Sequence, residues 1–347
     1  MEENPLPESY DSQESTGCTN CGSSAVLEGY SNRLCNECRQ LYIKYPIPLW
    51  VKLFAAAVAI VMLFSLFTFP KSVSLGLHLE KGRRLEQKRQ YLSAQRELEA
   101  VTKLYPDNIE ANGYLMIAAF YNMDYKTLVT AQSHLENREI EDADLYGTLN
   151  DLVNRVDHYY PDTTISNLID RYGTDEKVPD TVWNRFITRH PHSIYAFMSY
   201  ANILYDRHDY GQCDSLLNLV LAEDGFCLGA LRMLACSQRE QRLWDKSIAS
   251  CQKILQLNQE AGYAFAIMSR TYLKQEKNAL GLDLAQKALA VNSTDPYNVA
   301  HLAVAWHYNN EPSKRDALLK ELKAHKDSAS ILCLERAEDI IQHKEKL

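Results

Sequence analysis

The chain has 347 residues, 46% of them hydrophobic and 24% charged, which is an ordinary composition for a folded protein. Its formal net charge is −8, and this acidic balance argues against a general nucleic-acid binder. Residues 1–17 are polar and acidic and contain two prolines, so we expect a disordered tail there.

Residues 18–38 contain four of the nine cysteines, arranged as two C-x2-C pairs. These are Cys18, Cys21, Cys35 and Cys38. Each pair can offer two thiolates from one tight turn, and two pairs complete a tetrahedron around zinc. The pattern resembles a zinc ribbon holding a structural Zn²⁺, and four protein ligands leave no position for a catalytic water. A pair of disulfides is the alternative interpretation. Residues 1–47 hold seven acidic and three basic side chains, which favours a small protein-docking module over nucleic-acid binding.

The most apolar segment of the chain covers residues 47–69 and is interrupted only by Lys52. At 1.5 Å per residue this segment is long enough to cross a hydrocarbon core of roughly 30 Å. We therefore predict one transmembrane helix over 47–69. A buried core helix is disfavoured because the run is too long and too uniformly apolar, and a cleaved signal peptide is disfavoured because the run starts too late.

Thiolate chemistry and charge distribution indicate opposite orientations for this predicted helix. Thiolate ligands persist in a reducing compartment, which places the zinc knuckle in the cytoplasm and the rest of the chain on the periplasmic or exoplasmic side. Basic residues near the run are more numerous on its C-terminal side, which indicates the reverse. Most of those basic residues belong to a predicted helix that needs a polar face in any case. The prediction is a single-pass membrane protein with the knuckle in the cytoplasm.

From residue 75 onward the sequence has helical periodicity, and four stretches align with a period of 34 residues. They cover 194–227, 228–261, 262–295 and 296–329. Position 8 of each stretch is small, because the two helices of a hairpin cross there. It is held by Ala201, Ala235, Ser269 and Ala303. This register resembles the tetratricopeptide repeat. Residues 75–142 follow the same register, although Met116 departs from the small residue at position 8.

The resemblance implies an all-α fold, a tetratricopeptide-like helical-hairpin solenoid, preceded by the transmembrane helix and the small zinc ribbon. We expect N-terminal repeats at 75–142, an irregular helical segment at 143–193, four repeats at 194–329 and a capping helix at 330–347. One hairpin cannot bury its apolar face alone, so neighbouring hairpins stack into a superhelix.

The first helix of each hairpin is expected to line the concave face of this superhelix. Tyrosine and arginine, the side chains that most often anchor protein interfaces, are frequent at these positions. The predicted partner-binding residues are Tyr195, Asn202, Tyr205, Arg232, Arg239, Tyr263, Arg270, Tyr297, His307 and Tyr308. The alternative interpretation is that these are ordinary solvated repeat positions.

The sequence contains no P-loop, G-x-G-x-x-G, H-E-x-x-H or G-x-S-x-G motif, so we expect neither an enzyme nor catalytic or cofactor-binding residues. The predicted function is a membrane-anchored protein–protein interaction scaffold that binds a partner peptide or helix in its concave face. Two alternatives are a transmembrane sensor that relays partner binding to the zinc knuckle, and an accessory subunit of an envelope assembly complex. The layout resembles that of bacterial membrane proteins and does not specify the partner, the pathway or the oligomeric state.

Overall fold

The computed structural model describes residues 17–43, 47–343 and 347, and it describes no side chains for residues 66–72. The predicted disordered tail over 1–17 therefore lies almost wholly outside the described residues. The chain divides into two compact units, Met1–Ser72 and Val73–Leu347, and each is described below by itself.

The cysteine-rich part of the first unit is a short turn structure followed by helix α1 (Asn36–Ile43). Val26 and Cys35 form one antiparallel bridge, and the Leu27 N–H donates a hydrogen bond of 3.2 Å to the Leu34 carbonyl. The predicted ribbon is therefore reduced to a single bridge within the described residues. The chain turns after Cys35 into a helix, which places Cys38 one turn further along the same element.

The apolar segment predicted at 47–69 forms the N-terminal part of helix α2 (Leu49–Gln87). Among the residues whose side chains are described, no helix is both long enough and apolar enough to cross a membrane. The predictions of a transmembrane helix and of a single-pass localisation are therefore wrong. The predicted orientation, with the knuckle in the cytoplasm, depended on that helix and is wrong as well. The apolar segment does not form a helix of its own: it continues without a break into the polar part of α2, which ends at Gln87. The two alternative functions that depended on a membrane span lose their basis.

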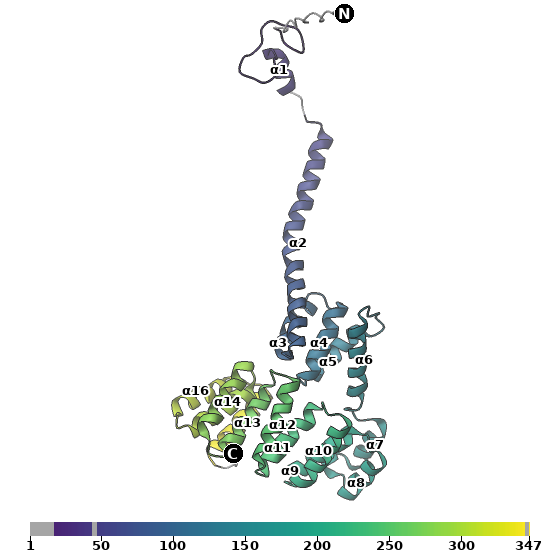
Figure 1. Cartoon of the computed structure of the whole chain (residues 1–347), viewed down its shortest axis with the longest axis vertical. Coiled ribbons are helices and arrows are strands. Elements are labelled where there is room, and N and C mark those ends of the chain that lie inside the picture. Colours follow the sequence, from purple (N-terminus) through teal and green to yellow (C-terminus); the bar gives the residue numbers. More distant parts are fainter. Residues whose placement is uncertain (1–16, 44–46, 344–346) are drawn as a thin grey trace, which may run out of the picture. The chain divides into compact units, whose positions relative to one another are not determined.

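The second unit is an array of helices in which consecutive helices lie side by side (Figure 1). The N-terminal repeats hold α3 (Tyr91–Thr102), α4 (Ile109–Tyr121) and α5 (Tyr125–Leu135). The middle segment holds α6 (Ala143–Asp157), α7 (Thr163–Tyr172), the short 3-10 helix η1 (Asp175–Lys177) and α8 (Asp180–Arg189). The C-terminal hairpins pair α9 (Ile194–Asp206) with α10 (Tyr210–Glu223), α11 (Leu228–Glu240) with α12 (Trp244–Leu257), α13 (Gly262–Leu273) with α14 (Asn278–Val291), and α15 (Pro296–Tyr308) with α16 (Pro312–Ala324), and α17 (Ser328–Ile341) follows. Helices make up most of the described residues of this unit, as the sequence predicts.

One backbone feature fixes the period of the hairpins. Shortly after the first helix of each C-terminal hairpin, one residue takes the left-handed conformation, with φ between 58° and 65°. These residues are His208, Arg242, Glu276 and Asn310, each 34 residues from the next. The residue that follows each of them donates its N–H back to the helix, as Leu243 does to the Gln238 carbonyl at 2.8 Å. This arrangement caps the exposed carbonyls of the helix and reverses the chain at the same place in every repeat.

The small residues at position 8 lie where the two helices of a hairpin touch. Ala201, Ala235, Ser269 and Ala303 are all fully buried. In the N-terminal repeats Gly82 takes this place, and a Cβ atom added there would lie 2.7 Å from Cγ of Leu98. Because packed interiors leave no room for such an overlap, the close approach of α2 and α3 requires glycine at this position.

The first hairpins of the unit also contact the C-terminal array, far away in the sequence. Asn258 donates from its amide to the Tyr121 carbonyl at 2.9 Å, and Ser93 bonds the Glu260 carboxylate through both its N–H and its hydroxyl. A third contact joins α6 to the loop after α10, where Arg155 pairs with Asp224 at 3.1 Å. These contacts join the N-terminal repeats and the middle segment directly to the C-terminal hairpins.

Candidate functional site

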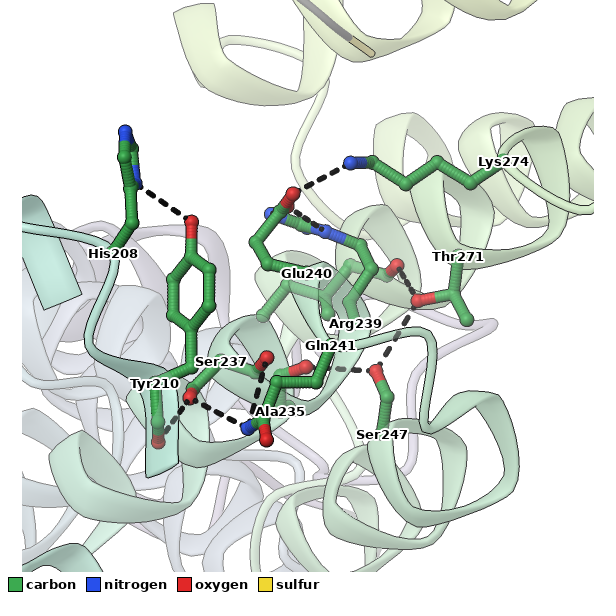
Figure 2. A network of polar contacts seen from close by, with 11 residues as sticks. His208, Tyr210, Ala235, Ser237, Arg239, Glu240, Gln241, Ser247, Thr271 and Lys274 are labelled. Atoms are coloured by element: carbon green, nitrogen blue, oxygen red, sulfur yellow. Dashed lines mark hydrogen bonds and ion pairs between the residues drawn. The ribbon is translucent and has the colours of Figure 1, made fainter. Parts of the chain in front are cut away.

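The first helices of the C-terminal hairpins carry a buried polar cluster. The guanidinium group of Arg239 bonds the Glu240 carboxylate through two nitrogens, at 2.8 and 2.9 Å, and Lys274 reaches the other oxygen of that carboxylate at 2.6 Å. Figure 2 shows both cations directed at Glu240. Arg239 exposes only 3% of its surface. Glu240 and Lys274 are 34 residues apart, so they hold the same position in successive repeats.

Hydrogen bonds behind this cluster hold the helices that carry it. The Ser247 hydroxyl of α12 donates to the Ala235 carbonyl of α11 at 2.8 Å and lies 3.2 Å from the Thr271 hydroxyl of α13 (Figure 2). Ala235, Ser247 and Thr271 are all buried, and a buried polar atom that lacks a hydrogen bond is costly. The backbone that presents Arg239 is thereby fixed relative to the backbone of the next repeat.

The charges and the burial of this cluster shift the pKa values of its members. Burial raises the pKa of Glu240, but pairing with Arg239 and Lys274 outweighs it, and the pKa lies below its ordinary value. Burial, together with the nearby charges of Arg239 and Arg336, lowers the pKa of Arg270. Arg239, Arg270 and Lys274 thus lie near the Glu240 carboxylate, and Arg336 lies near Arg270.

A cavity of about 130 Å³ adjoins the cluster between α13, α15 and α17. Its polar side is formed by Arg270, Tyr297, His301 and Arg336. The pKa of the His301 imidazole lies well below its ordinary value, because burial and the neighbouring guanidinium groups disfavour its charged form. The apolar side is formed by Leu273, Ala300, Val304, Leu332, Ala337, Ile340 and Leu347, among others. An apolar cavity of about this size accepts one aliphatic side chain or a small ring.

Five of the predicted partner-binding residues converge on this region. They are Tyr205, Arg239, Arg270, Tyr297 and Tyr308, which interact electrostatically with one another or with the cluster. Tyr263 and Arg232 form a second group, in which Tyr125 of α5 also takes part. The convergence follows from the repeat register, because equivalent positions of successive first helices face the same side.

The remaining three predicted residues make other contacts. The Tyr195 N–H donates to the His158 carbonyl of the segment before α7, and Asn202 is exposed and bonds Asp206 at 3.4 Å. His307 lies 3.3 Å from a guanidinium nitrogen of Arg315 in α16. The structure does not place these three in the cluster.

Several members of the cluster were not singled out from the sequence. Glu240 and Lys274 stand at a position that the repeat register assigns to the concave face, so the register could have identified them. Arg336 belongs to α17, after the last repeat, and no repeat position signals its place. His301 stands one position away from those assigned to the concave face.

The knuckle brings its four cysteines together. The Sγ atoms of Cys18, Cys21, Cys35 and Cys38 all lie within 4.8 Å of one another, and those of Cys21 and Cys35 are 3.5 Å apart. Zn–S bonds of roughly 2.3 Å place the sulfurs of a tetrahedral site roughly 3.8 Å apart, so the four positions fit this metal. The Asn20 amide donates to the Cys38 sulfur at 3.3 Å, as an outer partner of a thiolate ligand does.

The protonation of these thiols depends on their mutual contacts. A backbone hydrogen bond from Cys35 is the largest cause that lowers the pKa of Cys18 to about 6. For Cys38 the Asn20 amide lowers the pKa, but the adjacent thiols Cys21 and Cys35 and burial together raise it to about 12. Four thiolates this close repel one another, and a divalent cation removes that repulsion.

The fold and these two sites define an all-helical hairpin array that is accompanied by a four-cysteine cluster. No family model matches the chain, and no curated protein matches it. Among solved structures, a tetratricopeptide repeat protein from Parabacteroides merdae ATCC 43184 shows 12% identity and a TM-score of 0.39 over 78% of this chain and 88% of that one. The crystal structure of MamA shows 11% identity and a TM-score of 0.37, and the match covers 54% of this chain and 99% of that one.

A third solved structure is that of YrrB, a tetratricopeptide repeat protein with an unusual peptide-binding site. It shows 14% identity and a TM-score of 0.31, and the match covers 48% of this chain and 98% of that chain. At these identities and TM-scores, nothing about the site or the partner of this chain follows from the similarity.

Proposed function

We propose that this protein is a protein–protein interaction scaffold whose concave face binds an acidic segment of a partner. The observation that supports the proposal is the concentration of cations beside the cavity: Arg239, Arg270 and Lys274 lie near Glu240, and the exposed Arg336 lies near Arg270. A guanidinium group that already has one partner can still donate further hydrogen bonds, and a positively charged surface attracts an acidic segment. The guanidinium fork suits a carboxylate because it can donate two parallel hydrogen bonds.

The cavity beside the cluster adds a second element of recognition. Its apolar wall lies next to Arg270 and Arg336, so an aliphatic side chain of the partner would enter it while a neighbouring acid met the guanidinium groups. Tyr297 lines the cavity and Tyr205 lies near Arg239, and both rings offer large contact area and few rotatable bonds. The partner is thus a short peptide that combines acidic and aliphatic residues, and binding requires no catalytic group.

The knuckle is proposed to hold one structural zinc ion through Cys18, Cys21, Cys35 and Cys38. The support is the geometry of the four sulfurs and the small amount of apolar surface around them. Bound zinc would neutralise the thiolates and fix the turn before α1. With four protein ligands the metal keeps no open position, so its role is structural.

Fluorescence anisotropy with labelled peptides tests the concave face. The probes are a short peptide of alternating Glu and Leu and a matched peptide in which Lys replaces Glu. We expect the acidic peptide to bind and the basic one to fail. Arg239→Gln and Arg270→Gln should each weaken binding at least about tenfold, which corresponds to about 1.4 kcal/mol.

Lys253→Gln provides the control, because Lys253 is an exposed cation on α12, a second helix of its hairpin. It removes one charge without touching the cluster, so binding should change by less than about twofold. Equal weakening by all three variants would show that only the overall charge matters. Binding of both peptides alike would contradict a site selective for acids.

A further inference from the structure

A second cationic site lies away from the concave cluster, in the hollow between α7 and α8. Three arginines line this hollow together with His190 and the hydroxyl side chains of Thr163 and Thr164. The arginines are Arg171, Arg185 and Arg189. The hollow has a volume of about 470 Å³, within the range of small-molecule sites. None of its lining residues is a carboxylate.

The arrangement of the three arginines follows from the two helices. Arg185 and Arg189 are four residues apart on α8 and therefore project from the same face, while Arg171 stands in the last turn of α7. Each of the three is exposed, and within the described residues none forms an ion pair. Like charges at this helical spacing repel each other, so the surface is unfavourable until an anion joins it.

Other arginines of the same region behave differently. Arg207 pairs with Asp180 at 2.6 Å, and Arg155 pairs with Asp224 at 3.1 Å. Two carboxylates lie near the hollow along the chain. Asp170 precedes Arg171 on α7 but does not line the hollow, and Asp162 accepts the Ile165 N–H at 2.8 Å as the cap of α7 and lines the adjoining hollow together with Arg189 and His190. Helix dipoles favour Arg171 and Arg189 at the C-terminal ends of their helices, but Arg185 stands before the last turn of α8.

The chemistry of the lining suits phosphate. Guanidinium groups bind phosphate oxygens in pairs, and hydroxyl groups and the first N–H groups of a helix add further donors. Thr163 and Thr164 stand in the first turn of α7, and both line the hollow together with Arg189 and His190. The floor is apolar, with Phe186 buried against the core and its ring stacked on His190 at 4.4 Å.

We propose that the hollow between α7 and α8 binds a small ligand that carries two or more phosphate groups. Arg185 and Arg189 hold one phosphate group, and Arg171 meets the next along the groove. The proposal is independent of partner binding on the concave face, because it uses none of the residues assigned there.

Isothermal titration calorimetry on the full chain tests this site, at fixed ionic strength. The probes are inorganic pyrophosphate, ADP and a soluble inositol bisphosphate headgroup, so that a free diphosphate, a nucleotide and a lipid headgroup are distinguished. Citrate serves as an anion without phosphorus. We expect at least one phosphate probe to bind at least tenfold more tightly than citrate. Arg185→Gln and Arg189→Gln should each weaken that binding at least tenfold.

Lys177→Gln is the matched control, because Lys177 is an exposed cation between the two helices that does not line the hollow. It should change binding less than twofold. The three variants replace exposed side chains, and unchanged circular dichroism will confirm that each is folded. Failure of all three phosphate probes to bind would overturn the proposal. Citrate binding as tightly, or Lys177→Gln weakening binding as much as the arginine variants, would also overturn it.

Discussion

The knuckle and the helical array reach a folded state by different means. The core of the knuckle consists of three buried cysteines, with Val26 and Leu34 only partly buried against them. The array instead buries large apolar side chains, such as Trp183 and Leu217, which are completely enclosed. Burial of apolar surface is the main favourable term in folding, and the knuckle has too little of it. In the proposed zinc-bound state, bonds from thiolate to metal would supply the stability that apolar burial does not.

This contrast also separates what each region tolerates. Every hairpin of the array shares its core with its neighbours, so one weakened contact leaves many others in place. The knuckle depends on four sulfurs, and each one is needed to complete the tetrahedron. The two regions should therefore lose stability independently and by very different amounts.

The largest expected effect is loss of the knuckle on metal removal. Cys35→Ser, or a strong zinc chelator added to the full chain, removes an apparent zinc-binding free energy of roughly 10–16 kcal/mol. Zinc content should fall from one ion per chain to none. Nuclear magnetic resonance signals of residues 17–43 should collapse to unfolded positions.

The control for this experiment is Cys333→Ser, which removes a thiol from α17 and should keep the zinc. The helical melting transition of the array should remain where it is after chelation. A melting transition that shifts together with the zinc content would contradict the independence of the two regions.

The next effect is a large loss of stability inside the array. The Trp183 ring is fully buried and stacks on Tyr200 with ring centroids 5.6 Å apart. Trp183→Ala leaves a cavity there and should lower the free energy of unfolding by about 3–5 kcal/mol. Urea denaturation measures the loss, and zinc content should stay unchanged. Trp50→Ala is the control, because Trp50 is 70% exposed, and its effect should be within about 0.5 kcal/mol.

A smaller loss is expected at the contact between α6 and the loop after α10. Asp224 accepts hydrogen bonds from Arg155 and from the Tyr159 hydroxyl, and its side chain is 10% exposed. Asp224→Asn removes the charge that neutralises Arg155 and should cost about 2 kcal/mol in urea denaturation. The neighbouring Glu223 forms an exposed pair with His192, so Glu223→Gln should cost less than about 0.5 kcal/mol. Equal losses of stability in the two variants would show that the buried ion pair contributes no more than the exposed one.

The smallest effect is the pH dependence that Glu240 gives to the array. The pKa of this carboxyl is lower in the folded protein than its ordinary value, because Arg239 and Lys274 outweigh the effect of burial. Its stabilising contribution is therefore complete above the unfolded-state pKa of about 4.3 and is lost as the pH falls through the folded-state pKa. The free energy of unfolding of Glu240→Gln, measured across this window, should depend less steeply on pH than that of the unchanged protein. Identical slopes would refute this assignment.

The sequence predicts the repeat period and the helix crossings of the array because both depend on particular residue types at fixed spacings. Ala201, Ala235 and Ser269 mark the helix crossings at a fixed period, and their complete burial confirms this. Spacing likewise places the cysteines correctly, since two C-x2-C pairs can close around one centre. The prediction of a membrane span was wrong: within the described residues no helix is long and apolar enough for one, and hydropathy alone did not reveal that the segment belongs to the longer helix α2.

Period, hairpin crossings and the clustering of the four cysteines were thus determined by the sequence itself, through contacts between residues close along the chain. The tertiary structure alone decided which distant groups meet. Asn258 reaches Tyr121, and Arg336 of α17 joins the cluster around Arg270. Only the structure brings Arg171 and Arg189 to one hollow. Such contacts depend on how stacked helices curve and pack, and small angles at each hairpin add up over many residues in a way that no single spacing encodes.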